Sequence, residues 1–170
     1  MKILISESQY TRLQEKFKIG SDERIKLFEN EDFLLVIPLT HLASCKYGAK
    51  TTWCTSAKDD DMWSRHDALG ATGYLMVKNP DLQDRLGSEK FAFYLNVPSA
   101  YYGKNFNTDR INFYDELNNS IPNIIFLRMM DEVGKYSDFN NMANLFVQYT
   151  KNKFSPDNNE LIKKGVKKPF

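Results

Sequence analysis

The sequence of 170 residues predicts an α+β protein, a single domain (1–170) with a central, mostly antiparallel sheet, flanking helices and a helical C-terminal third. Segments rich in β-branched and aromatic residues follow one another through the first two thirds of the chain, separated by polar turns. After residue 121 the apolar residues recur at helical spacing instead. We therefore expect a core at about 25–118, a helical region at about 121–154 and a short basic tail at 155–170.

The N-terminal part predicts a strand, a helix and then a hairpin. KILI, residues 2–5, has the composition of a strand, and Ser6 can cap a helix that ends at Gly20. ERIKLFEN (23–30) and DFLLVIP (32–38) are apolar and strand-like. The polar residues between these two segments predict a tight turn that joins them as a hairpin.

The middle of the chain predicts two short helices and three further strands. Thr40 can cap a helix HLASCKYG, which Gly48 would end by adopting a positive φ. The acids of DDDMWSRHDALG suit the N-terminus of a second helix, and Gly70 suits its end. The expected strands are GYLMVKN, EKFAFYLNV and RINFYDE, the first two joined by the polar stretch PDLQDRLGS.

Two amphipathic helices are expected at the C-terminal end. IPNIIFLRMMDEVG has Pro122 in its first turn and Gly134 as a stop, with an apolar face at Ile125, Met129 and Val133. SDFNNMANLFVQYTKNKF begins with Ser137 or Asp138 as cap. Its apolar residues are Phe139, Met142, Leu145, Phe146 and Tyr149.

Composition excludes several classes of function. Hydrophobic residues make up 42% and aromatic residues 14%, which suits a packed core rather than a disordered chain. The net charge of +1 predicts no general attraction to nucleic acid or to anionic membranes. The start of the chain lacks the features of a signal peptide, and no apolar run is long enough to span a bilayer. We expect a cytoplasmic protein that is not secreted and has reduced cysteines.

One short window, residues 41–66, contains both cysteines and both histidines of the chain: His41, Cys45, Cys54 and His66. Structural zinc sites usually combine two close ligand pairs, whereas only His41 and Cys45 are spaced as such a pair here. The sequence therefore predicts no metal and no cofactor.

A thiol active centre is the second interpretation of this window. It would use Cys54 as nucleophile, His66 as base and Asp115 to orient the base, with Asp67 and Asp109 as other orienting candidates. The structural interpretation buries Trp53, packs Cys54 beside it as an inert thiol and lets Thr51, Thr52 and Thr55 bond the backbone of the loop.

The run IPLTHLASCKYGAKTTWCTSAKDDDMWSRH, followed by GYLMVKN, KFAFYL and INFYDELNN, resembles a pattern of bacteriophage and mobile-element proteins. The YGxxTxWCT motif is similar to part of PcfJ-like proteins. The resemblance covers roughly Phe33 to Asn118 and is carried by Tyr47, Gly48, Thr51, Trp53, Cys54 and Thr55. It implies a virus of bacteria as the source and no particular chemistry.

Two functions follow as hypotheses. The first, slightly favoured because no acid/base set is convincing, is a phage accessory protein that binds a host or viral macromolecule, a protein rather than a nucleic acid. Its candidate binding residues are Tyr47, Thr51, Thr52, Thr55, Tyr101, Tyr102, Lys104 and Arg110. The alternative is a small enzyme, a Cys/His-type hydrolase or transferase, with Cys54, His66 and Asp115 as catalytic residues.

Overall fold

The computed structural model describes residues 23–53, 61–97 and 107–155. Six strands form one sheet in the order β1-β2-β3-β4-β5-β6, and every neighbouring pair is antiparallel. The predicted α+β class is thereby confirmed. The strands are β1 (Arg24–Glu29), β2 (Phe33–Pro38), β3 (Gly70–Val77), β4 (Lys90–Asn96), β5 (Asn112–Asp115) and β6 (Ser120–Ile121).

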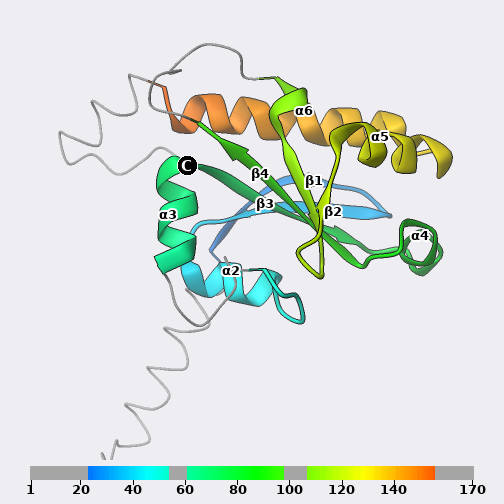
Figure 1. The fold of residues 1–170 in the computed structure, drawn as a ribbon, viewed down its shortest axis with the longest axis horizontal. Coiled ribbons are helices and arrows are strands. Elements are labelled where there is room, and N and C mark those ends of the chain that lie inside the picture. The colour runs from blue at the N-terminus through cyan, green and yellow to red at the C-terminus, as the bar shows by residue number, and fades with distance from the viewer. Residues whose placement is uncertain (1–22, 54–60, 98–106, 156–170) are drawn as a thin grey trace, which may run out of the picture.

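The helices lie on both faces of this sheet. They are α2 (His41–Tyr47), α3 (Asp61–Leu69), α4 (Pro80–Leu86), α5 (Asn123–Glu132) and α6 (Tyr136–Lys153), with a 3-10 turn η3 (Thr108–Arg110). Figure 1 shows α5 and α6 lying across one face, which we call the inner face, while α2 lies against the other, the outer face. No helix in these described ranges is both long and apolar enough to cross a membrane.

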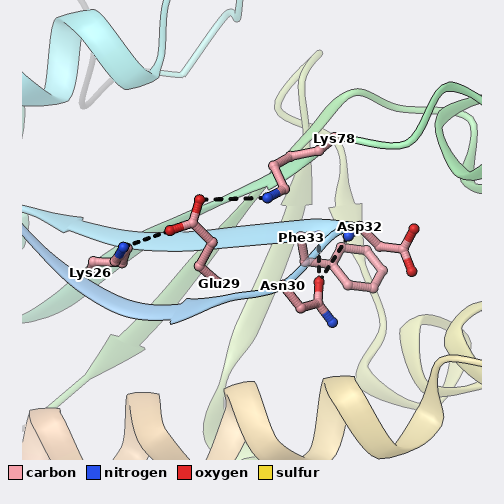
Figure 2. Close-up of polar contacts among 6 residues, drawn as sticks. All are labelled: Lys26, Glu29, Asn30, Asp32, Phe33 and Lys78. Carbon is pink, nitrogen blue, oxygen red and sulfur yellow. Dashed lines mark hydrogen bonds and ion pairs between the residues drawn. The ribbon is translucent and has the colours of Figure 1, made fainter.

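The predicted hairpin of β1 and β2 is confirmed, and Asn30 builds its turn. The side-chain oxygen of Asn30 accepts hydrogen bonds from the backbone N–H groups of Asp32, at 3.0 Å, and Phe33, at 2.8 Å (Figure 2). An asparagine that accepts from the backbone ahead of it mimics a backbone turn. The Glu29 carboxylate lies between two lysines, 2.6 Å from Lys26 Nζ and 3.5 Å from Lys78 Nζ.

Asp32 ties this hairpin to two distant parts of the chain. Its side chain is only 6% exposed, and it accepts a hydrogen bond from Asn79 Nδ2 at 2.8 Å. Lys135, in the turn between α5 and α6, lies 2.5 Å from the same carboxylate. The hydrogen bond from Lys135 is the main reason why the pKa of Asp32 is lowered. A buried carboxylate needs such partners to remain charged.

Phenylalanine rings dominate the core between the inner face and the two C-terminal helices. Phe126 of α5 stacks on Phe113 of β5 at 4.3 Å between ring centroids and meets Phe91 of β4 edge-on at 5.1 Å. Gly73 leaves room for Phe146 of α6, because a Cβ at this position would lie 3.0 Å from the Phe146 ring. The fully buried large side chains here are Phe33, Leu35, Leu75, Phe91, Phe93, Phe113, Phe126, Met130, Met142 and Phe146.

The predicted apolar face of α5 was wrong by one residue. Phe126 and Met130 are fully buried, whereas Ile125 is 40% exposed and Met129 and Val133 are partly buried at the edge of the core. IIFL supplies four consecutive apolar residues, so spacing alone permits more than one buried stripe. The aromatic contacts of Phe126 with the sheet select the stripe that is buried.

The stretch PDLQDRLGS, expected to be a polar connection, forms helix α4. The Asn79 side chain caps it by accepting from Asp81 N at 3.0 Å, and Pro80 occupies the first turn. Gly87 ends the helix with φ 72°, a conformation that suits glycine. Leu82 and Leu86, one turn apart, bury the inner side of the helix. Each of these signals acts over a few residues, and the spacing of apolar residues along the chain does not reveal them.

Candidate functional site

Small side chains leave a hollow in the middle of the outer face. Two neighbouring rows of residues run across the strands there. The first row is Val36, Tyr74, Ala92 and Tyr114, and the second is Thr72, Tyr94 and Asn112. Because Ala92 and Thr72 are short, the space above them is bounded by the larger side chains of Tyr94 and Tyr114, which lie diagonally across β4 and β5.

Trp53 forms one wall of this hollow. It is 3% exposed, as the structural interpretation predicted, and its ring centroid lies 4.7 Å from that of Tyr74. Its Nε1–H donates to the backbone carbonyl of Asp115 at 2.6 Å. The indole is therefore anchored to β3 by its ring and to the end of β5 by its N–H.

The loop before Trp53 is held by its threonines. Thr51 Oγ1 donates to the carbonyl of Gly48 at 2.6 Å, within the loop itself as predicted. Thr52 bonds a different segment, since its backbone N–H donates to the carbonyl of Glu116 at 2.9 Å. The prediction of a positive φ at Gly48 was wrong: Gly48 has φ −85°, and Lys50 takes the left-handed conformation with φ 65°. The hydrogen bond of Thr52 holds the chain beside the end of β5 just after this residue.

Helix α2 positions the start of this loop. The predicted N-cap is confirmed, because Thr40 Oγ1 accepts from Ala43 N at 3.1 Å. Ser44 Oγ lies 2.7 Å from the buried Tyr74 hydroxyl, which fixes the helix against β3. At its C-terminal end, Lys90 Nζ donates to the carbonyls of Tyr47, at 3.0 Å, and Ala49, at 2.7 Å. A cation suits this position because helix C-termini carry unpaired carbonyls and partial negative charge.

Helix α3 brings His66 to the opposite side of the hollow. The His66 ring lies 4.7 Å from the ring of Tyr94. Burial lowers the pKa of His66 below its usual value of 6.5, so the imidazole is neutral at pH 7. The end of α3 is held by Lys153 of α6, whose Nζ donates to the Asp67 carbonyl at 2.6 Å and to the Gly70 carbonyl at 2.8 Å.

These elements enclose a pocket of about 160 Å³. It is lined by Trp53, His66, Thr72, Ala92, Tyr94, Tyr114 and Asn118. None of these seven lining residues carries a formal charge when His66 is neutral. The lining thus combines aromatic rings, among them two hydroxyl-bearing tyrosines, with one amide. Such a mixture of apolar walls with a few polar groups is typical of ligand sites.

The structure places only some of the predicted site residues at this pocket. His66 lines it, and Thr51 and Thr52 hold the loop that carries Trp53. Tyr47 lies at the end of α2 and packs against the cluster that contains Trp53, while Arg110 is exposed in η3. Five predicted residues lie outside the described part of the chain, namely Cys54, Thr55, Tyr101, Tyr102 and Lys104.

Asp115, the predicted orienting acid, builds a turn. Its carboxylate accepts from the backbone N–H groups of Leu117, at 3.0 Å, and Asn119, at 2.8 Å, and from Asn119 Nδ2 at 2.9 Å. Asp115 pairs with Phe91 of the inner-face core, whereas Tyr114, one residue earlier, lines the pocket. Side chains alternate between the faces of a strand, so the Asp115 carboxylate leaves the sheet on the side opposite His66.

The tyrosines of the pocket were not among the predicted site residues. EKFAFYLNV is a strand as predicted, and its Phe91 and Phe93 are buried in the inner core at 1% and 0% exposure. Tyr94 and Tyr114 are half-buried and face the other way. A strict period of two in FAFYL and NFY already separates these tyrosines from the phenylalanines. Only the register of β4 with β5 shows that both tyrosines border one hollow.

The remaining cysteine and histidine of the window form a pair on α2. Cys45 Sγ lies 3.4 Å from His41 Nε2, one helical turn away. Partial burial raises the pKa of the Cys45 thiol, which opposes thiolate formation at neutral pH. Within residues 23–53, 61–97 and 107–155, no group of three His, Cys, Asp or Glu side chains is arranged to hold a metal ion.

Comparison of the chain with protein-family models, with curated proteins and with solved structures gives no match.

Proposed function

We propose that this protein is a binding protein, and that the outer pocket receives a side chain of a macromolecular partner. The observation that carries the proposal is the pocket itself, bounded by Trp53, His66, Tyr94 and Tyr114. Its walls come from a loop, a helix and two strands, each held in place by its own hydrogen bonds or ring contacts. Preformed aromatic hollows with a polar rim are the usual anchor points of protein interfaces.

A protein partner suits the pocket better than a nucleic acid. Lysine and arginine supply most of the affinity of proteins for nucleic-acid phosphates, and neither occurs among the seven residues that line the hollow. The resemblance of the YGxxTxWCT region to bacteriophage and mobile-element proteins supports a phage accessory role. We extend the proposal to a host or viral protein met in the bacterial cytoplasm.

Nuclear magnetic resonance with blocked amino-acid amides tests this function. Trp53 and Trp63 each give an indole N–H signal, and only Trp53 lines the pocket. Titration with a set of N-acetyl amino-acid amides should shift the Trp53 signal for at least one amide and leave that of Trp63 unchanged.

A matched pair of variants makes the test specific. Ala92→Leu places a larger side chain on the floor of the pocket and should abolish the shift, whereas the same change at Ala68, exposed on α3, should preserve it. If no amide shifts the Trp53 signal, or if Ala92→Leu leaves the shift intact, the pocket is not the binding site.

The enzyme hypothesis retains one supporting observation. The His66 imidazole lines the pocket and is neutral at pH 7, the state that a general base requires. Cys54 directly follows Trp53 in the chain.

Alkylation of Cys54 by iodoacetamide separates the enzyme hypothesis from the binding hypothesis. In a Cys45→Ser background, the enzyme hypothesis predicts alkylation much faster than that of a free thiol, slowed by His66→Gln. The binding function predicts alkylation no faster than that of a free thiol and unaffected by His66→Gln.

A further inference from the structure

We propose that the group received by the outer pocket is an alkylammonium ion, the side chain of a lysine or methylated lysine on the partner protein. This inference rests on the proposed binding function and specifies its ligand. It follows from three features of the pocket: the aromatic side chains that line it, the charges around it, and the size and arrangement of the hollow.

Aromatic side chains make up most of the lining. The Trp53 Nε1–H donates to the Asp115 carbonyl and is therefore not available to a ligand. The indole ring itself lines the pocket. Tyr94 and Tyr114 add two phenol rings, which lie diagonally on the sheet. The face of an aromatic ring carries negative charge density, and tryptophan and tyrosine attract cations most strongly.

The charges around the pocket are compatible with a cation. Burial keeps the His66 imidazole neutral, so it does not repel one. The ammonium groups of Lys90 and Lys153 are bound to backbone carbonyls at the ends of α2 and α3. Lys90 also interacts with the nearby Glu116 carboxylate, and Arg65 is exposed on α3. Among the described residues that line the pocket, an anionic ligand would find no basic side chain.

The shape of the hollow favours a compact group over a flat one. Its aromatic residues come from a loop, a helix and two strands around the short side chains of Thr72 and Ala92, and its volume is about 160 Å³. A flat ring stacks well on one wall at a time. A rounded ammonium ion can contact several ring faces together, which is the arrangement that aromatic cages use for methylated ammonium groups.

Choline and 3,3-dimethylbutan-1-ol form the test pair, because they have nearly the same shape and differ in charge. With the Trp53 indole signal as readout, choline should bind roughly 2- to 30-fold more tightly than the alcohol, the factor that a cation–π contact supplies. N-acetyl-trimethyllysine amide should bind at least as tightly as choline. Equal or tighter binding of the alcohol, or tighter binding of adenosine, would overturn the inference while leaving the pocket a binding site.

A variant pair shows whether the rings are responsible. Tyr114→Leu keeps an apolar wall but removes a ring face, so choline should lose most of its advantage while the alcohol binds as before. Tyr136→Leu, a matched change at an exposed tyrosine of α6, should alter neither affinity. If choline keeps its full advantage in Tyr114→Leu, the ring of Tyr114 does not bind the cation. If no probe shifts the Trp53 signal in any variant, the proposed binding function itself fails.

Discussion

The two faces of the sheet are covered by different kinds of packing. The inner face packs Phe91, Phe93 and Phe113 against α5 and α6, with Phe126 in contact with all three rings. The outer face packs a smaller cluster around Trp53 and Tyr74, and a hollow lined by Trp53 and by His66 of α3 remains beside it.

We expect this difference to separate the residues that stabilise the fold from those of the proposed binding site. Large rings that interlock on the inner face leave little space, and such packing supplies most of the free energy of folding. On the outer face, backbone carbonyls at helix ends are bound by Lys90 and Lys153, and Trp53 is anchored by a hydrogen bond. These polar contacts hold the walls of the pocket in place without filling it. We therefore expect substitutions on the inner face to affect stability most, and those on the outer face to affect binding.

Phe126→Ala should have the largest effect. Deleting a fully buried phenylalanine removes apolar burial and leaves a cavity, a loss of about 3–5 kcal/mol in the free energy of unfolding. Tyr114→Ala, at a half-buried position on the outer face, should cost less than half of that. Urea denaturation of both variants measures the two values. Similar losses for the two would show that the faces contribute equally to stability.

Asp32→Asn should have the next largest effect, about 1.5–3 kcal/mol, because it removes the charge that bonds Lys135. The pKa of Asp32 is lowered in the folded protein, so its contribution is present above the unfolded pKa of about 3.9 and is lost as the pH falls through the folded value. The stability difference between wild type and Asp32→Asn should therefore shrink toward zero in acid.

Denaturation between pH 7 and pH 2.5 tests this expectation. Glu31→Gln, at an exposed neighbouring position, is the control and should change stability little at any pH. If the difference in free energy of unfolding between wild type and Asp32→Asn does not depend on pH, the ion pair with Lys135 is not its cause.

Lys153→Met should cost about 1–3 kcal/mol, because it leaves the buried carbonyl of Gly70 without this donor. Lys151→Met, exposed on the same helix, should change stability by less than about 0.5 kcal/mol.

Since Lys153 holds the end of α3, its loss should also broaden the Trp53 indole signal or weaken choline binding. Destabilisation without any change at the pocket would show that α3 keeps its position without Lys153.

His66 should give the smallest effect, confined to mildly acidic pH. Its pKa is lowered in the folded protein, so the unfolded chain binds the proton more readily as the pH falls below about 6.5. Wild-type stability should therefore decline slightly between pH 6.5 and the folded pKa, and His66→Gln should remove that decline. The pH titration of the His66 ring signals, with His41 as internal comparison, measures the folded pKa directly. A His66 pKa at or above 6.5 would rule out this decline.

Much of the fold is encoded in local signals. Asn30 and Asp32 specify the first hairpin, Thr40 specifies the start of α2, and the apolar spacing after residue 135 specifies α6. Helix α4 has signals of the same kind, with Asn79 and Pro80 at its start and Gly87 at its end, although a polar connection was predicted there. These features can be read from the sequence because each depends on hydrogen bonds or dihedral angles within a few residues.

The sequence by itself determined the α+β class and the approximate positions of strands β1 to β5, since alternation and helical spacing follow from backbone geometry alone. It did not predict β6. Only the tertiary structure decided which stripe of α5 is buried. Phe126 is selected by contacts with Phe91 of β4, Phe113 of β5 and Phe139 of α6 rather than by its neighbours in the chain. The pocket likewise depends on the register that places Ala92 opposite Tyr114 and on Lys153 reaching α3 across the fold. Long-range contacts of this kind leave no local pattern, so the sequence identified His66 and Trp53 but not the tyrosines that complete their site.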